Sequence, residues 1–106
     1  MRQSISLITL SLLLLTSPLL GQSKETGGLF FRYGNEDVGW YEEDDGSKSG
    51  KYFGDIENGL PNGQGTETFP DGGKYEGEWK NGDPWNGTKY DKDGNIIDNY
   101  VNGVIQ

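Results

Sequence analysis

The sequence contains neither cysteine nor histidine among its 106 residues. Without thiols, disulfides and cysteine-based metal sites are excluded, and without imidazole the commonest general base of enzymes is missing. Basic residues are also few: nine stand against 17 acidic ones, which gives a formal net charge of -8. Because nucleic acids and anionic membrane surfaces are negatively charged, we expect them to repel this chain. The composition therefore predicts no nucleic-acid partner and no thiolate metal site, and we expect no cofactor and no bound metal.

Sustained apolar sequence is confined to residues 1–23. Arg2 is followed by an apolar run and then by Pro18 and small residues, the build of a secretory signal peptide. An uncleaved membrane anchor is the alternative, but Ile5–Leu20 is shorter than the roughly 20 residues that a span needs. We predict an N-terminal signal-peptide helix that is removed, and a mature chain that is secreted or lies in the periplasm or cell envelope.

The rest of the chain lacks any helical period and is rich in glycine, with 18 residues of that type. Residues 24–50 are predicted to form a degenerate N-terminal hairpin and a loop. Lys24–Gly28 is polar and is expected to be a frayed terminus, while Leu29–Tyr33 and Val38–Glu42 are short aromatic runs typical of two strands.

The dominant feature is an internal repeat. The sequence YEGEWKNG at Tyr75–Gly82 resembles YFGDIENG at Tyr52–Gly59 and, more faintly, IIDNYVNG at Ile96–Gly103. In the two clear copies an aromatic, a glycine and a large apolar residue alternate with polar residues, which predicts a strand with one buried face. The glycine leaves room for a neighbouring aromatic ring or a close backbone approach. Each copy ends in Asn-Gly, a pair that accepts positive φ and reverses the chain.

A second strand follows each reversal, predicted at Gly65–Phe69 and at Gly87–Tyr90, and ends at an Asp-Gly turn. Alternating Asn-Gly and Asp-Gly turns predict a meander of β-hairpins in a single elongated, twisted antiparallel sheet. One hairpin with two or three aromatic residues is not stable by itself, so neighbouring hairpins must stack. The predicted fold class is all-β.

This repeat resembles that of the membrane occupation and recognition nexus (MORN) family. Residues 51–106 divide into repeats 52–74 and 75–95 and a partial cap, 96–106. The residues that define the repeat pattern are Tyr52, Gly54, Gly59, Gly63, Gly65, Phe69, Gly72, Tyr75, Gly77, Gly82, Gly87, Gly94 and Gly103. The second copy is shorter, with Asn86 at the place of Gly63, and is similar to divergent repeats of bacterial antitoxin-component-like proteins.

The resemblance implies a surface that binds other proteins or, in some members, phospholipid head groups, and it does not imply catalysis. We therefore expect a non-enzymatic interaction module with a protein partner. Binding to a membrane surface or to phospholipid head groups is the alternative, disfavoured by the negative charge, and an enzyme is a third reading. Self-association through open sheet edges is a further hypothesis.

The aromatic residues offered as partner-binding candidates are Trp40, Trp79, Trp85 and Tyr90. Core packing is the competing interpretation at repeat positions. Trp85 replaces Asn62 of the first copy within an expected loop, so either an exposed anchor or a packed ring fits there.

Several acidic groups also have two interpretations. The run Glu42–Asp45 could bind calcium or a basic partner, but it lacks the spacing of a calcium loop, and a solvated loop is favoured. Asp91–Asn95 is predicted to be a turn. Glu76 and Glu78 lie two apart on a strand, so they are expected to share the outward face and not to act as an acid-base pair.

Overall fold

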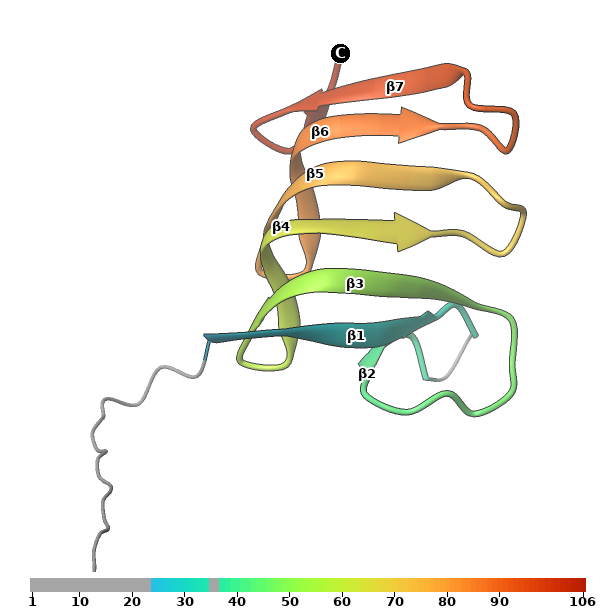
Figure 1. The fold of residues 1–106 in the computed structure, drawn as a ribbon, viewed down its shortest axis with the longest axis vertical. Coiled ribbons are helices and arrows are strands. Elements are labelled where there is room, and N and C mark those ends of the chain that lie inside the picture. Colours follow the sequence, from blue (N-terminus) through green and yellow to red (C-terminus); the bar gives the residue numbers. More distant parts are fainter. Residues whose placement is uncertain (1–23, 35–36) are drawn as a thin grey trace, which may run out of the picture.

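The computed structural model describes residues 24–34 and 37–106, so the predicted signal peptide lies outside the described residues. In these ranges all the regular secondary structure is β-strand, and eight strands form one open antiparallel sheet (Figure 1). The strands are β1 (Lys24–Arg32), β2 (Gly39–Tyr41), β3 (Ser49–Glu57), β4 (Leu60–Thr68), β5 (Lys74–Lys80), β6 (Asp83–Tyr90), β7 (Ile96–Val101) and β8 (Val104–Ile105). Across the same ranges, no helix is long and apolar enough to cross a membrane. The all-β prediction is confirmed.

The strand order is β2-β1-β3-β4-β5-β6-β7-β8, so the predicted meander is confirmed from β3 onward. At the N-terminal end it is wrong, because β1 lies between β2 and β3. All nine residues of β1 pair with β3, from Lys24 opposite Glu57 to Arg32 opposite Ser49, whereas β2 pairs with β1 at three positions.

The frayed terminus predicted for Lys24–Gly28 is also wrong, since these residues form the first half of β1. Their side chains are largely exposed, so the alternation that marks a half-buried strand is missing from this segment. What holds the segment is backbone pairing with β3, which a polar sequence can make as well as an apolar one.

The predicted Asn-Gly reversals are confirmed as two-residue turns in which both residues have positive φ, as in a type I′ hairpin. The φ angles are 55° and 77° at Asn58-Gly59, 50° and 91° at Asn81-Gly82, and 51° and 82° at Asn102-Gly103. Strands β4 and β6 begin directly after these turns, earlier than the predicted starts at Gly65 and Gly87. The prolines near their starts do not prevent this, because proline is tolerated at the beginning of a strand.

A row of glycines crosses the sheet. Gly54, Gly65, Gly77 and Gly87 are successive register partners on β3 to β6. The register shifts next to this row, between Gly54 and Ile56 and between Gly77 and Trp79. Such bulges bend a sheet, and the ribbons of β4 and β6 turn sharply in this region (Figure 1).

Tyrosine rings fill the space that the glycines leave. A Cβ atom built on Gly65 would lie 2.2–2.4 Å from atoms of the Tyr52 side chain, and one on Gly87 would lie 2.5–2.7 Å from the Tyr75 side chain. The prediction that glycine makes room for a neighbouring aromatic residue is confirmed. The closest ring contact is made with the glycine of the following strand, while each tyrosine hydroxyl also comes near the glycine of its own strand, 2.7 Å from a Cβ on Gly54 and 3.2 Å from one on Gly77.

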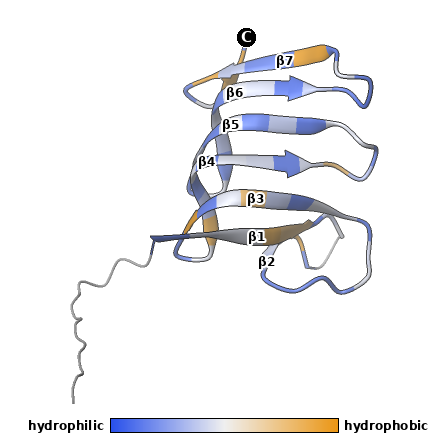
Figure 2. Ribbon diagram, viewed as in Figure 1, coloured by the Kyte–Doolittle hydropathy of each residue, from blue (hydrophilic) through white to orange (hydrophobic). Residues whose placement is uncertain are grey.

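We call the face that carries Tyr52, Ile56, Tyr75 and Trp79 the inner face, and the opposite one the outer face. These four residues and Leu29 form the buried core. Because the core consists mainly of Tyr and Trp, which have intermediate hydropathy, much of the central strands looks pale or blue in Figure 2, and strong hydrophobic colour appears on β1, on β7 and near the β3–β4 turn.

The sheet curls over its inner face. Trp40 of β2 lies with its ring centroid 5.8 Å from that of Trp79 on β5. In a flat sheet the four intervening steps of about 4.8 Å would separate these strands by about 19 Å. The first edge of the sheet therefore closes over the core, and this closure shapes the inner face.

Candidate functional site

A row of aromatic and charged side chains runs along the inner face. Its members are successive register partners on β3 to β7: Tyr52, Glu67, Tyr75, Lys89 and Asp98. Glu67 is 5% exposed, and its Oε2 accepts a hydrogen bond of 2.9 Å from the Tyr33 hydroxyl. The Lys89 ammonium lies 4.9 Å from the ring centroid of Phe69. Charged groups are thus held within an aromatic surface.

Burial controls the protonation of these groups. It raises the pKa of Glu67, while the Tyr33 hydrogen bond and the Lys89 charge act in the opposite direction. Burial also raises the pKa of Tyr33 and brings that of Tyr52 to about 12. At neutral pH both phenols are therefore neutral hydrogen-bond donors.

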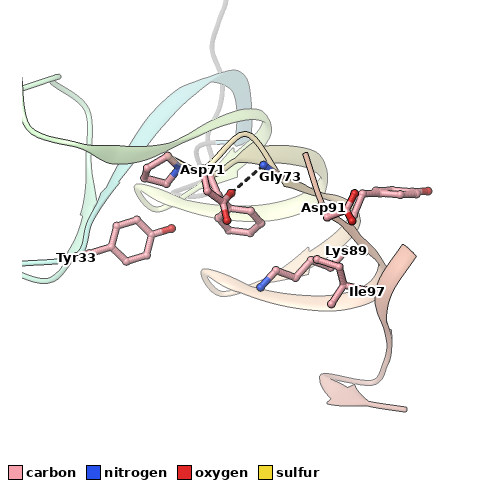
Figure 3. Close-up of a pocket in the computed structure, with 9 residues that line it drawn as sticks. Tyr33, Asp71, Gly73, Lys89, Asp91 and Ile97 are labelled. Carbon is pink, nitrogen blue, oxygen red and sulfur yellow. Dashed lines mark hydrogen bonds between the residues drawn. The ribbon is translucent and has the colours of Figure 1, made fainter. Parts of the chain in front are cut away.

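A groove of about 470 Å³ opens at the end of this row, beside the Asp-Gly turns (Figure 3). Its lining comprises Tyr33, Phe69, Pro70, Asp71, Gly73, Lys89, Tyr90, Asp91 and Ile97. In Figure 3 the Tyr33 ring faces the groove from one side and Lys89 from the other. A second hollow, of about 240 Å³, shares Tyr33, Phe69 and Lys89 and extends over the inner face to Trp40 and Tyr100. We call the two together the inner groove.

Two carboxylates at the end of the inner groove accept hydrogen bonds from backbone amides of their own turns. Asp71 Oδ1 accepts from the Gly73 amide at 2.9 Å. Asp91 Oδ1 accepts from the amides of Asn95 and Asp93, each at 2.9 Å. These hydrogen bonds, with the largest contribution from the Asn95 amide, lower the pKa of Asp91. The predicted turn at Asp91–Asn95 is confirmed, and its leading carboxylate holds the turn closed.

The acidic run Glu42–Asp45 is an exposed loop, as favoured from sequence. It is fixed by Arg32, a residue that sequence analysis did not single out. The Arg32 Nε lies 3.3 Å from Asp45 Oδ2, Nη2 donates to the Glu43 carbonyl, and the guanidinium lies 3.6 Å from the Tyr41 ring centroid. Over the described ranges no group of three acidic side chains is placed to hold a metal ion.

The four candidate aromatic residues do not come together, because two lie on each face. Trp40 and Trp79 are on the inner face. Trp79 is 2% exposed and its Nε1 donates to the Gly65 carbonyl at 3.1 Å, so its ring belongs to the core and is not accessible to a partner. Trp40 is half-buried, and its Nε1 donates to the Gly82 carbonyl at 3.1 Å.

Trp85 and Tyr90 each lie beneath a lysine of β5 on the outer face, and Tyr90 also lines the first hollow of the inner groove. Lys80 Nζ is 4.4 Å from the Trp85 ring and Lys74 Nζ is 5.5 Å from the Tyr90 ring. Both lysines alternate with the buried Tyr75 and Trp79, so they project outward. The outer face thus carries its own aromatic and basic residues.

The loop predicted at Trp85 is wrong, since this residue lies within β6. Its equivalence to Asn62 is also wrong. The Trp85 carbonyl accepts from the Gly103 amide just as the Pro61 carbonyl accepts from the Gly82 amide, both at 2.8 Å.

Asn86 is instead the counterpart of Asn62, and not of Gly63 as the repeat spacing suggested. The side chains of both asparagines accept from the backbone amide of the next Asn-Gly turn, at 2.9 Å in each case. Both also donate from Nδ2 to a glutamate of the preceding strand at 2.8 Å.

The sequence did not point to Tyr33, Glu67 and Lys89 as members of a site, and Phe69 stood out only as part of the repeat. The sequence did contain a signal for Glu67 and Phe69, which is their spacing along the strand. Glu67 and Phe69 have the same strand parity, so one must face inward if the other does. Tyr33 reaches the groove only because β1 pairs with β3, which the sequence did not reveal.

Comparison with known families agrees with the repeat geometry. The family model of the MORN repeat matches residues 52–74 and 75–85. This match supports the MORN repeat at residues 52–85. The first match has the bounds predicted from sequence, while the second ends at Trp85, just before the displaced Asn86. Searches of curated proteins and of solved structures gave no significant match.

Proposed function

We propose that the MORN repeats of this chain form a non-enzymatic module that binds a protein partner in the inner groove. The observation that carries this proposal is the groove itself, an aromatic surface that the core leaves open. Tyr33 and Ile97, on opposite sides of the groove, are 47% and 51% exposed. Exposed aromatic and aliphatic residues around a hollow are the usual anchors of protein interfaces.

The rigidity of the groove favours the same function. Its walls stand on paired strands and on turns closed by Asp71 and Asp91, so a partner would meet a preformed surface. The single ammonium of Lys89 and the buried carboxylate of Glu67 supply polar contacts within apolar walls. We infer that a peptide segment with apolar side chains and a few polar groups is the ligand.

Absence of catalysis is part of the proposal. Three carboxylates around the groove accept hydrogen bonds, that of Glu67 from Tyr33 and those of Asp71 and Asp91 from their own turns. Acid-base catalysis needs a group free to exchange a proton with a substrate, and the sequence supplies no histidine for this role. Asp83 and Lys89 also line the second hollow. The lining places no activated nucleophile beside either of them.

Location and lineage remain proposals from the sequence. The N-terminal apolar segment supports export of a mature chain from about Lys24, with eight basic residues after loss of Arg2 and a net charge of 8 - 17 = -9. The shortened second repeat supports a bacterial, antitoxin-component-like variant. These points predict a partner that is secreted or lies in the periplasm or cell envelope.

Site-specific photo-crosslinking tests the proposal. A benzophenone amino acid at position 97 would stand in the inner groove, and one at position 53, where Phe53 is 65% exposed on the outer face, is the matched control. With envelope extract we expect one defined protein to crosslink at position 97 and not at 53. The purified partner should then lose affinity for Ile97→Ser and keep it for Phe53→Ser.

Other outcomes would redirect the proposal. Equal crosslinking at both positions would remove the inner groove as the site, and no crosslinked protein at either position would count against a protein-binding module. Flotation with zwitterionic and anionic vesicles completes the test. We expect no bound protein, because the negative chain should avoid anionic lipid; binding to vesicles would favour the head-group alternative.

A further inference from the structure

The three Asn-Gly hairpin tips have the same sequence and the same turn type but different surroundings. Asn-Gly is the dipeptide in which the asparagine side chain most readily undergoes deamidation, because glycine leaves the following amide unhindered. All three asparagines are exposed. The chain therefore contains an internal comparison of one reactive sequence in three structural settings.

Two of the tips are each fastened to the preceding hairpin. At the tip of β5–β6, the Asn81 amide donates to Asn62 Oδ1 at 2.9 Å and the Gly82 amide donates to the Pro61 carbonyl at 2.8 Å. The tip of β7–β8 repeats this arrangement. There the Asn102 amide donates to Asn86 Oδ1 at 2.9 Å, and Gly103 donates to Trp85 as described above.

The tip of β3–β4 is the exception. Within the described part of the chain, neither Asn58 nor Gly59 donates such a hydrogen bond to another hairpin. No atom lies within 4 Å of a Cβ built on Gly59, whereas Trp40 is 3.4 Å from one on Gly82 and Trp85 is 3.0 Å from one on Gly103. The first tip is open where the other two are covered.

We propose that Asn58 is a site of spontaneous deamidation in the folded protein and that inter-hairpin hydrogen bonds protect Asn81 and Asn102. In this reaction the Gly59 amide nitrogen attacks the side-chain carbonyl carbon of Asn58. A carbon–nitrogen bond forms, the amide proton is lost and ammonia leaves, which gives a cyclic succinimide. Water then opens the ring at either carbonyl to yield aspartate or isoaspartate.

Protection follows from what the attack requires. The type I′ turn fixes the backbone of the asparagine, so the turn must open before the side-chain carbon and the glycine nitrogen can meet. Opening the second or third tip breaks two additional hydrogen bonds, one of them made by the attacking nitrogen itself. Local opening is rarer where more such bonds must break.

The product would alter the tip. Either form adds a carboxylate next to Glu57 in the chain. Glu57 is the register partner of Lys24 at the start of β1. Isoaspartate also lengthens the backbone by one carbon, which a two-residue turn cannot accommodate without change. Deamidation is therefore expected to loosen the junction between β1 and the first hairpin.

Peptide mass spectrometry after incubation of the protein in mildly alkaline buffer tests the proposal. We expect Asn58 to deamidate about tenfold faster than Asn81 or Asn102, because each protected tip holds two additional hydrogen bonds of modest net strength. In denaturant the three rates should become similar. Similar rates in the folded protein, or a faster rate at either protected tip, would overturn the proposal.

Two variants separate the hydrogen bonds from general stability. Asn62→Ala removes the acceptor for Asn81, so it should accelerate deamidation at Asn81 and leave Asn102 slow. Asn86→Ala should do the reverse. If both leave all three rates unchanged, the bonds do not protect. If one variant accelerates both protected tips together, it has unfolded the chain, and the other variant then decides the outcome.

Discussion

The hairpins β3–β4 and β5–β6 use the same contacts with different residues. In each, the tyrosine hydroxyl donates to the carbonyl three residues ahead, from Tyr52 to Asp55 at 2.6 Å and from Tyr75 to Glu78 at 2.7 Å. Each ring covers a glycine of the following strand. These contacts fasten the tyrosine to the backbone at the bend of its strand, so they define the hairpin more closely than residue spacing does.

The two hairpins differ after the bend. Ile56 in the first corresponds to Trp79 in the second, and both are buried. The asparagine that receives the next turn is Asn62 in the first hairpin and Asn86 in the second, because Trp85 is added before it and the Gly63-Gln64 pair is missing after it. The bulge absorbs this change, so the stacking of hairpins does not depend on a fixed repeat length.

We expect the largest effect on stability from Trp79, the position at which the buried residues of the two hairpins differ most. Trp79 packs edge-on against Trp40, Tyr52 and Tyr75, with centroids 5.0–5.8 Å away. We expect Trp79→Ala to lower the free energy of unfolding by about 3–5 kcal/mol. Urea denaturation would measure this, with Ile56→Ala as the comparison. A loss for Trp79→Ala no greater than that for Ile56→Ala would show that the two positions are equivalent.

The glycine row predicts the next largest effect. Gly77 has a φ of 148°, and a Cβ there would lie 2.5 Å from the Asn86 carbonyl oxygen and 2.6 Å from the Gly87 Cα. Because both obstacles are backbone atoms, Gly77→Ala should cost about 2–4 kcal/mol.

The matched control for the glycine row is Gly34→Ala, where no atom lies within 4 Å of the new Cβ. Its unfolding free energy should stay within about 0.5 kcal/mol of the wild type. Equal effects of the two substitutions would contradict the role given to the glycine row.

The shared tyrosine contact gives a smaller effect. Tyr52→Phe and Tyr75→Phe each remove a hydroxyl that bonds a backbone carbonyl and leave the ring in place. We expect each to reduce the unfolding free energy by about 0.5–1.5 kcal/mol. Similar losses would support the equivalence of the two hairpins. A loss at only one of them, in parallel urea denaturations, would show that the bend is stabilised differently in the two.

The smallest effect is a pH dependence at the boundary between the hairpins. Glu67 lies between Tyr52 and Tyr75 in the register, and burial raises its pKa above the ordinary value of 4.5. The folded state therefore binds this proton more tightly than the unfolded state does. Stability should fall as the pH rises from about 4.5 through the raised pKa.

Glu67→Gln isolates this contribution, because glutamine can still accept the Tyr33 hydrogen bond but does not ionise. We expect the difference in melting temperature, variant minus wild type, to increase between about pH 4 and pH 7. A difference that is constant with pH would mean that burial does not raise the pKa of the Glu67 carboxyl group. Glu76→Gln, at an exposed position of the outer face, is the control.

Much of the fold could be predicted because its signals are local. The alternation around Tyr52 and Tyr75 gave the buried face, and the three Asn-Gly pairs gave the turns, since each depends on residues close together in the chain. The inner groove could be predicted only in part. Of the candidates, Trp40 and Trp79 line its second hollow and Tyr90 lines its first, but Trp85 lies on the other face, and Tyr33 and Lys89 were missed.

The sequence by itself determined the strands, their turns and the glycines that admit the tyrosine rings. Tertiary structure alone decided the rest: that β1 inserts between β2 and β3, that the sheet curls until Trp40 meets Trp79, and that Asn86 takes the place of Asn62. These outcomes depend on backbone pairing and on contacts between distant strands. Backbone groups are the same in every residue, so their choice of partner leaves little trace in the sequence.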